Sequence, residues 1–273
     1  MALLENKIAI VTGAGRGLGA AMARAFAREG AEVVVVDRDA AVADAVADEI
    51  KAAGDSATGE ALDITNRKDV FAFGARITER YGTIDVLVNN AGISQRSLAI
   101  DSDFEVYRRI VEVDLLAPIA LTQKLLPHLI EREASWVVNI SSVAGKVGVP
   151  MRTGYCAAKH GLVGYGDSLR AECGVHGLNL LTVAPGSVRT DVSRNALDSG
   201  GLRRGVSDKA IEEGMEPDAV AARIVEALVK GEREIVIADG MEAGLPGLRA
   251  ESPDQAFDLM DRLVRDGYAK RMA

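Results

Sequence analysis

The stretch KIAIVTGAGRGLG, from Lys7 to Gly19, decides the fold of this chain. Its first part, Lys7–Thr12, is mostly apolar and β-branched, which is typical of a buried strand. Closely spaced glycines follow, and the alanine-rich run Gly17–Glu29 then predicts a helix. A buried strand that passes through a glycine turn directly into a helix is typical of the opening unit of a parallel α/β domain.

The same alternation continues along the chain. Further strands are predicted at Ala31–Val36, Ile84–Val88, Trp136–Ile140, Leu178–Ala184 and Glu234–Ala238. Helices are predicted at Ala40–Ala53, Asp101–Glu131, Tyr155–Cys173 and Asp218–Val229. Strands that are apolar on both faces and alternate with helices favour a parallel sheet covered on both sides. With right-handed crossovers, the simplest topology is a single domain over 1–273, a doubly wound (Rossmann) α/β sheet of about seven strands.

Composition excludes several classes of protein. The chain has 273 residues, 48% of them hydrophobic, so it can bury a large core. Its net charge of −8, without a long Lys/Arg run, makes nucleic acid a poor partner. No signal peptide and no membrane-length apolar stretch are evident, and Cys156 and Cys173 lack the spacing of a metal site. We therefore expect a cytoplasmic protein with reduced thiols, no metal and no membrane partner.

The glycine turn suits the binding of a pyrophosphate. Glycines let the backbone turn sharply and approach the phosphates without a Cβ clash, and the following helix N-terminus offers free N–H groups. Asp37 closes the second strand, 20 residues after Gly17. A carboxylate at that point binds both ribose hydroxyls of an adenosine and repels a 2′-phosphate, which favours NAD over NADP. Arg16 and Arg38 argue the other way, because either is able to pair with a 2′-phosphate.

Four motifs together resemble the short-chain dehydrogenases/reductases, from about residue 5 to 240. They are Thr-Gly-xxx-Gly-x-Gly (Thr12 to Gly19), Asn89-Asn90-Ala91-Gly92, Ser142 with Tyr155 and Lys159, and Pro185-Gly186. Each motif alone is modest, but their order and spacing are those of the family. The stretch Pro118–Ala196 is most similar to the branch called dehydrogenase/reductase family member seven and its bacterial relatives.

The resemblance implies a cofactor site and a catalytic group. It puts Asp63 by the adenine ring, Asn90, Ala91 and Gly92 at the adenine-side ribose, and Val188 and Thr190 on the nicotinamide carboxamide. The full set of expected cofactor-binding residues is Gly13, Gly15, Arg16, Gly17, Leu18, Gly19, Asp37, Arg38, Asp63, Ile64, Asn90, Ala91, Gly92, Tyr155, Lys159, Pro185, Gly186, Val188 and Thr190. Tyr155 and Lys159 would be the central catalytic pair, with Ser142 on the substrate oxygen.

These residue types suit hydride transfer between a nicotinamide cofactor and an alcohol or carbonyl carbon. The cofactor handles the hydride, and the protein supplies an acid/base for the proton and a donor for the oxygen. Tyr155 and Lys159 are four residues apart on a predicted helix and share a face. A free tyrosine titrates near pH 10, about three units too high for a base at neutral pH. A nearby ammonium, aided by the oxidised nicotinamide ring, stabilises the phenolate.

One residue departs from the family pattern. Asp114 stands where the family usually carries an asparagine that helps to hold a water linked to the lysine. An aspartate keeps the main-chain carbonyl that does much of this. Its charge, however, would raise the pKa of Lys159 and weaken the pull of the lysine on Tyr155. We therefore expect an active enzyme with an altered pH profile, and we count Asp114 among the catalytic candidates.

Substrate identity is not encoded in these motifs. The loops expected to line the substrate are Ile93–Ile100, Lys146–Gly154 and Val188–Glu216. The last, 188–216, is irregular, and we expect it to close over substrate as a mobile lid. Its arginines would meet an acidic substrate or, more simply, form a solvated lid surface: Arg189, Arg194, Arg203 and Arg204. The C-terminal extension 241–273 holds one weak amphipathic stretch, Asp254–Arg265, without an assigned role.

Three functions remain open at this point. The first is an NAD(P)-dependent oxidoreductase acting on a small alcohol/carbonyl substrate. The second is a catalytically silent dinucleotide-binding redox sensor, which needs the glycine turn but neither Tyr155 nor Lys159. The third is a scaffold, which needs neither site. The resemblance also implies a homotetramer, or a homodimer that pairs the long helices.

Overall fold

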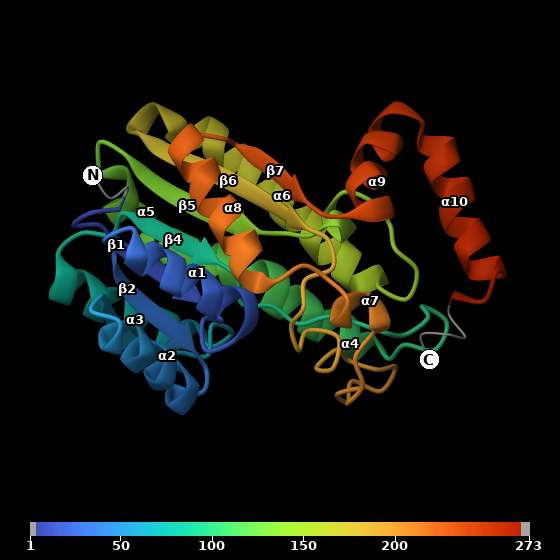
Figure 1. Cartoon of the computed structure of the whole chain (residues 1–273), viewed down its shortest axis with the longest axis horizontal. Helices are drawn as coiled ribbons and strands as arrows, with labels where there is room; N and C mark the ends of the chain where they lie inside the picture. The colour runs from blue at the N-terminus through green and yellow to red at the C-terminus, as the bar shows by residue number, and fades with distance from the viewer. Residues whose placement is uncertain (1–3, 269–273) are drawn as a thin grey trace.

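Seven parallel strands form one sheet in the computed structural model, which describes residues 4–268 (Figure 1). Their order across the sheet is β3-β2-β1-β4-β5-β6-β7. The strands are β1 (Ile8–Thr12), β2 (Glu32–Asp37), β3 (Ser56–Ala61), β4 (Val86–Asn89), β5 (Ser135–Ile140), β6 (Leu178–Pro185) and β7 (Glu234–Ile237). All six neighbouring pairs are parallel, which confirms the doubly wound sheet expected from the sequence.

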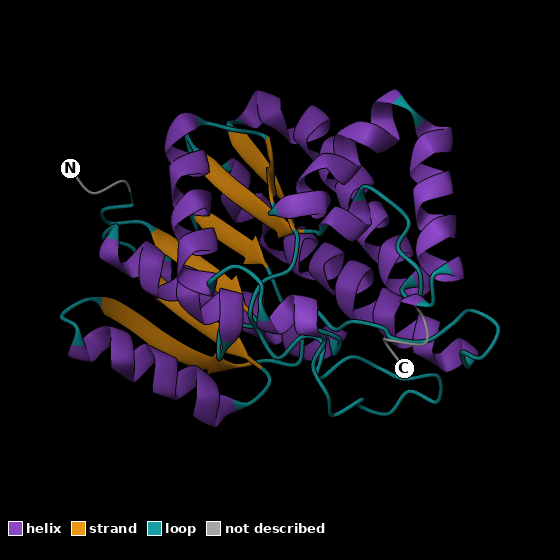
Figure 2. Ribbon diagram, turned by 45° about the vertical axis from the view of Figure 1, so that its right-hand side comes forward, coloured by secondary structure: helices purple, strands orange, loops and turns teal. Residues whose placement is uncertain are grey.

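Helices connect the strands and cover the sheet on both sides (Figure 2). The α-helices are α1 (Gly17–Arg28), α2 (Ala40–Ala52), α3 (Arg67–Tyr81), α4 (Phe104–Val111), α5 (Ala117–Ile130), α6 (Thr153–Cys173), α7 (Lys209–Glu212), α8 (Pro217–Lys230), α9 (Gly240–Glu251) and α10 (Pro253–Arg265). A π-helical turn, η1 (Glu112–Leu116), joins α4 to α5, and short 3₁₀ turns are η2 (Val143–Gly145) and η3 (Gly174–His176).

The valines of β2 show how the sheet divides the core. Val33 and Val35 belong to a cluster with α1, α2 and α8, whereas Val34 and Val36 belong to a cluster with α3, α5 and α6. All four are fully buried. Because successive strand residues point to opposite faces, a continuous apolar run is required wherever both faces are covered.

The order of the strands creates a crevice at one edge of the sheet. From β1 the chain builds outward to β2 and β3, and it then returns to the other side of β1 with β4. Ligands bind in open α/β sheets at this switch point, outside the carboxyl ends of the strands. In Figure 1 the strand arrowheads point toward the side that carries α4, α7, α9 and α10.

Two elements near the start of the chain were not predicted from the sequence. Strand β3 contains Gly59 and Glu60 and lies at the sheet edge, so it carries no continuous apolar run. It forms because its backbone pairs with β2 over six residues, from Ser56 to Ala61. Helix α3 was missed because charged residues surround its buried positions, Val70, Phe73 and Ile77.

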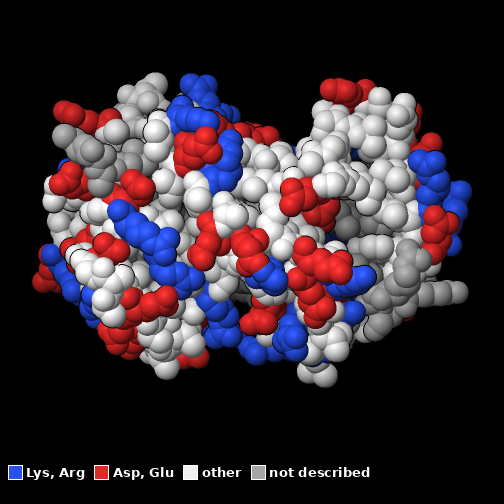
Figure 3. All heavy atoms as spheres, in the orientation of Figure 1, with Lys and Arg blue, Asp and Glu red and all other residues white. Residues whose placement is uncertain are grey.

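The described part of the C-terminal extension, up to residue 268, contains a helical hairpin, α9 and α10, that packs beside the carboxyl ends of the strands. The expected amphipathic stretch Asp254–Arg265 corresponds to α10, while α9 was not predicted. Figure 3 shows a notch in the outline between this hairpin and the body of the molecule, and acidic and basic side chains are interspersed on the face drawn. Within residues 4–268, no helix combines the length and apolar character needed to cross a bilayer.

Candidate active site

The glycine turn between β1 and α1 has the geometry of a backbone cradle. Gly13 and Gly17 have φ angles of 61° and 55°, which residues with a Cβ rarely adopt. A Cβ on Gly19 would lie 2.2 Å from the carbonyl oxygen of Gly13, so that position requires glycine for close approach. In the described chain the Arg16 side chain does not cap the first turn of α1. The amide groups of that turn are therefore available to an anion.

Asp37 ends β2 and turns its carboxylate toward the glycine turn. Its Oδ2 accepts the Gly15 amide at 3.1 Å, and its Oδ1 accepts the Asp39 amide at 3.2 Å. A carboxylate offers about four acceptor positions, so both oxygens retain capacity for hydroxyl donors. Arg16 and Arg38 are exposed on the same rim.

The segment containing Asp63 and Ile64 lies next to β2. The Leu62 amide donates to the Asp37 carbonyl at 2.8 Å, which holds this segment beside the end of β2. The Asp63 carboxylate accepts both the amide and the hydroxyl of Thr65, at 2.9 and 2.7 Å. Asp63 therefore stabilises its own turn, in addition to any role toward a ligand.

Asn90 connects β4 to the glycine turn. Its backbone amide donates to Thr12 Oγ1 at 3.0 Å, and its side-chain Nδ2 donates to the Thr12 carbonyl at 2.8 Å. The Thr12 hydroxyl in turn donates to the Val88 carbonyl, at 3.0 Å. A Cβ on Gly13 would lie 2.8 Å from Ala91 Cα, so the two segments touch. These contacts hold the Asn-Asn-Ala-Gly motif against the cradle.

Residues that follow β6 also approach the glycine turn. Thr190 follows the Pro185-Gly186 pair, and a Cβ on Gly17 would lie 3.1 Å from Thr190 Cγ2. The Thr190 hydroxyl donates to the Val188 carbonyl at 3.4 Å. The expected cofactor-binding residues that follow β1 and β6 therefore converge on one crevice, although they lie more than 160 positions apart in the sequence.

Lys159 lies at the centre of a buried polar group beside that crevice. Its Nζ donates to the Ile140 carbonyl at 3.0 Å and lies 3.2 Å from Asp114 Oδ2. The same Nζ is 5.6 Å from the centroid of the Tyr155 ring, one turn earlier on α6. The Lys159 side chain is 5% exposed and that of Asp114 is 0% exposed. A charged pair this deep in a protein is costly unless both partners are satisfied.

The π-helical turn η1 gives Asp114 its position. Its Oδ1 accepts the Ile93 amide at 2.9 Å while Oδ2 faces Lys159, so the carboxylate connects the segment after β4 to α6. Burial raises the pKa of Asp114, and the opposing pull of Lys159 does not cancel this effect. Burial alone would lower the pKa of Lys159, but Asp114 and then Tyr155 raise it overall. The raised pKa of Lys159 agrees with the effect of Asp114 that was expected from the sequence.

Ser142 lies just after β5, at the start of η2. Its Oγ accepts the Ala144 amide at 3.1 Å and donates to the Pro185 carbonyl at 3.4 Å. Its neighbour Ser141 donates to the Lys159 carbonyl at 3.1 Å, which holds the Ser142 loop against α6. Sequence reasoning missed Ser141, whose only signal was its position beside Ser142.

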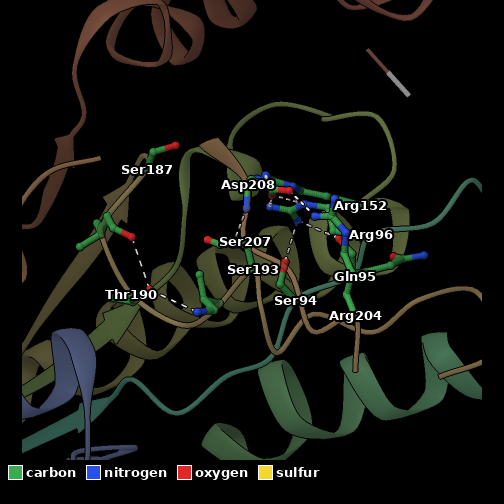
Figure 4. A network of polar contacts seen from close by, with 12 residues as sticks. Ser94, Gln95, Arg96, Arg152, Ser187, Thr190, Ser193, Arg204, Ser207 and Asp208 are labelled. Carbon is green, nitrogen blue, oxygen red and sulfur yellow. Dashed lines mark hydrogen bonds and ion pairs between the residues drawn. The ribbon is translucent and has the colours of Figure 1, made fainter. Parts of the chain in front are cut away.

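A second buried charged group was also missed, and it joins all three loops that were expected to line the substrate (Figure 4). Arg96 donates from Nε to Asp208 Oδ2 at 2.5 Å, and Arg204 pairs with Asp208 Oδ1. Arg152 lies 3.8 Å from the same carboxylate. The side chains of Arg96 and Asp208 are 2% and 0% exposed, and that of Arg204 is 13% exposed. Arg204 is therefore not part of a solvated lid surface.

Burial and the excess of arginines over carboxylates both shape the electrostatics of this Asp208 network. Burial and the neighbouring Arg152 lower the pKa of Arg96 to about 10, against the opposing effect of Asp208. Burial alone would raise the pKa of Asp208, but Arg96 and then Arg204 lower it overall. Arg152 Nε is buried without a hydrogen-bond partner among the residues that the structure describes. Throughout residues 4–268, this network included, no group of His, Cys, Asp and Glu side chains could hold a metal ion.

Comparisons with known proteins agree with this geometry. The family model described as short chain dehydrogenase matches residues 7–200. The chain is 34% identical to dehydrogenase/reductase SDR family member 7B of Bos taurus over 270 residues, which cover 97% of this chain and 83% of that protein. It is also 34% identical to a dehydrogenase/reductase SDR family protein 7-like of Drosophila melanogaster, over 86% of this chain and 74% of that protein.

Solved structures with the same fold contain nicotinamide dinucleotides. A metagenomic short-chain oxidoreductase in complex with NADP is 32% identical, with a TM-score of 0.72 over 87% of this chain and 99% of that chain. A short chain dehydrogenase/reductase from Burkholderia phymatum in complex with NAD has a TM-score of 0.82, over 94% of this chain and 97% of that chain. The second is 23% identical and therefore supports the fold alone.

Proposed function

Because the chain belongs to the short-chain dehydrogenase/reductase family, we propose that it interconverts an alcohol and a ketone or aldehyde with a nicotinamide dinucleotide. The observation that carries the proposal is the position of Lys159 Nζ. It lies 5.6 Å from the Tyr155 ring, at the sheet edge where the glycine turn and Thr190 face each other. Neither a sensor nor a scaffold requires a buried ammonium beside a phenol, whereas proton transfer to an oxygen does.

The residues of the crevice fit a dinucleotide. The turn admits no Cβ at Gly13 or Gly19, which leaves its surface as bare backbone, and the first turn of α1 offers its amide groups to a pyrophosphate. Asp37 would bind the adenosine ribose, and Val188 and Thr190 the nicotinamide carboxamide. When bound, the cofactor supplies or accepts the hydride.

The protein's own part in the reaction is proton transfer and orientation. During alcohol oxidation Tyr155 Oη would accept the hydroxyl proton of the substrate, and during carbonyl reduction it would return it. Lys159 holds positive charge beside the phenol, and its contacts with Ile140 and Asp114 fix its Nζ. Ser142 Oγ would donate a hydrogen bond to the substrate oxygen, exchanging its 3.4 Å contact with Pro185 for the new acceptor.

Two features bear on the choice between NAD and NADP. The Asp37 carboxylate faces the turn at the end of β2, where it would accept ribose hydroxyls and repel a 2′-phosphate. Arg16 and Arg38 are exposed and therefore free to rotate toward a phosphate. We infer a preference for NAD, to be measured by titrating both cofactors.

The segment 188–216 would cover the substrate, with motion confined to its tip. Its two ends are joined by the bond from the Met215 amide to the Ser187 carbonyl, and its second half is held by the Asp208 network. Between them the tip carries Gly200, Gly201 and the exposed Leu202. Limited proteolysis should cut this tip first and should cut it less with cofactor and substrate bound. Equal cleavage in both states would contradict a lid.

The decisive experiment is a turnover assay with NAD⁺ or NADP⁺ and a panel of secondary alcohols, followed by the absorbance of the reduced nicotinamide. We expect turnover with at least one alcohol. Cofactor binding without turnover across a broad panel would favour the redox sensor, and no binding would favour the scaffold.

The quaternary structure and cellular location stay predictions. The family resemblance implies a homotetramer, or a homodimer that pairs the long helices α4–α6. The cytoplasmic location is an expectation from the sequence alone. Light scattering of the purified protein in solution would measure the assembly, and a monomer at micromolar concentration would contradict it.

A further inference from the structure

The first helix of the C-terminal hairpin contacts the segment that follows β6. Glu242, in the first turn of α9, accepts two hydrogen bonds from Ser187: the backbone amide donates to Oε2 at 2.6 Å and the hydroxyl to Oε1 at 3.0 Å. Bonds to an ionised acceptor are short and strong, and one carboxylate that accepts two donors of one residue also fixes its orientation.

The surroundings of Ser187 leave this segment little freedom. On one side its carbonyl accepts the Met215 amide at 3.0 Å. On the other side a Cβ at Gly186 would lie 2.4 Å from Glu242 Oε2, so the glycine makes room for the carboxylate. The segment is therefore held between the end of the 188–216 loop and helix α9. Figure 4 shows Ser187 and Thr190 along this segment.

The same helix also contacts the loop that carries Ser142. Leu245, one turn after Glu242, is buried in a cluster with Val143 and Val147. Ser142 itself donates to the carbonyl of Pro185. Helix α9 therefore bridges the segments that leave the carboxyl ends of β5 and β6, the two strands nearest the proposed reaction centre.

We propose that Glu242 is a positioning residue for the nicotinamide end of the bound dinucleotide, acting through Ser187 on Val188 and Thr190. This inference rests on the proposed function, because it assigns those two residues to the carboxamide. It gives the C-terminal extension a role: the extension completes the cofactor site rather than adding a separate domain.

The position of the contact makes its effect selective. The adenosine half of a dinucleotide would rest on the glycine turn and on Asp37, which are held by Asn90 and β2, whereas the Glu242 carboxylate of α9 bonds to Ser187, after β6. Loss of the Glu242 contact should therefore weaken NAD binding and leave ADP-ribose binding unchanged. General unfolding of the site would weaken both.

The test compares Glu242→Ala, Glu242→Gln and Ser187→Ala by calorimetric titration with NAD⁺, NADP⁺ and ADP-ribose. For the cofactor that the wild type prefers, we expect Glu242→Ala to raise Kd about tenfold, which corresponds to about 1.4 kcal/mol. Glu242→Gln retains an acceptor for the Ser187 amide, and Ser187→Ala retains that amide, so both should show about a threefold rise in Kd. ADP-ribose should bind all variants within about twofold of the wild type.

A second readout needs no cofactor. Hydrogen–deuterium exchange of the free protein should show faster exchange of the peptide that contains the Ser187 amide in Glu242→Ala, with partial protection restored in Glu242→Gln. Met241→Ala serves as the matched control, since that exposed side chain lies on the same helical turn, and it should change neither readout.

Two results would overturn this inference about Glu242 and leave the proposed function standing. One is an equal loss of NAD⁺ and ADP-ribose binding in Glu242→Ala, and the other is unchanged NAD⁺ binding in that variant. A wild-type protein that binds neither NAD⁺ nor NADP⁺ would instead overturn the proposed function, and this inference with it.

Discussion

The glycine-turn half of the molecule, β1 to β3 with Asn90 against the turn, and the loop half, formed by the segments 93–100, 141–154 and 186–216, are stabilised in different ways. In the first, glycines let backbone segments approach closely, and short polar side chains, those of Asn90 and Thr12, bond to the backbone of neighbouring strand ends. In the second, buried ion pairs join loops that are far apart in sequence, as Arg96 and Asp208 do. In the proposed function the first half would bind the adenosine part of the dinucleotide, which is common to many enzymes, whereas the second would hold the nicotinamide end and must fit one substrate.

This comparison explains where mutations should act. Changes in the glycine-turn half should weaken binding of both the whole dinucleotide and ADP-ribose, and changes in the loop half should affect loop stability, binding of the nicotinamide end and substrate turnover. Tyr155 and Lys159 lie between the two halves, and removal of the Tyr155 hydroxyl should affect chemistry far more than cofactor binding. Four substitutions test this separation.

The largest effect on activity is expected from Tyr155→Phe, which changes a residue between the two halves. Removing the hydroxyl removes the proton donor and acceptor, a loss of about 10³-fold in kcat, while cofactor binding and Tm stay near those of the wild type. Steady-state kinetics and cofactor titration measure the two quantities. Tyr165→Phe is the control on the same helix, and it should retain activity. Intact turnover in Tyr155→Phe would end the proposed mechanism.

In the glycine-turn half, Gly19→Ala should weaken dinucleotide binding about a hundredfold. The added Cβ would lie 2.2 Å from the Gly13 carbonyl and 2.6 Å from Asn90 Nδ2, so the turn must open and lose the pyrophosphate geometry. Gly164→Ala, on α6, is the control because its added Cβ would meet nothing within 4 Å. Equal dinucleotide binding by the two variants would contradict the role assigned to the glycine-turn half.

In the loop half, Asp208→Asn should lower the free energy of unfolding by about 3 kcal/mol, because it leaves Arg96 buried without its charged partner. Thermal unfolding and proteolysis of 188–216 measure the effect, and ADP-ribose binding should survive. Asp198→Asn, in the same loop, is the control; it should change Tm little, because its neighbours Gly200 and Leu202 still find an oxygen acceptor.

The lowered pKa of Asp208 adds a pH test to the same substitution. A carboxylate with a depressed folded-state pKa contributes stability above its unfolded pKa, near 4, and that stability is lost as pH falls through the folded value. The wild-type loop should therefore become protease-sensitive in acid, below about pH 4. Asp208→Asn should lack this acid transition, and an identical transition in both proteins would assign it to another group.

The smallest effect on activity is expected from Asp114→Asn, which should shift the pH profile of alcohol oxidation by about one unit. Without the carboxylate, the ammonium of Lys159 stabilises the phenolate more strongly, so the acidic limb of alcohol oxidation moves to lower pH. Asp114 is also the largest of the contributions that raise the pKa of Lys159, so the alkaline limb should move to lower pH as well. A profile with both limbs unmoved would show that Asp114 is not coupled to the proton transfer.

The two halves also differ in how well they were predicted from the sequence. Every expected strand formed, and the glycine turn, Asp37, Asn90 and Thr190 were found at one crevice. Strand β3 was missed because an edge strand needs pairing partners more than apolar residues. Arg96, Arg152 and Asp208 were missed because a lone charge in a loop is usually solvated, and nothing local reveals its partner.

By itself the sequence determined the strand–turn–helix periodicity, the glycine turn and the spacing of Tyr155 and Lys159, since each depends on residues close together along the chain. Only the tertiary structure decided which distant groups meet. It paired Asp114 with Lys159, gathered three arginines around Asp208 and joined Glu242 to Ser187. The physical reason is that backbone geometry is local, whereas the energy of a buried charge depends on partners that only the complete fold brings together.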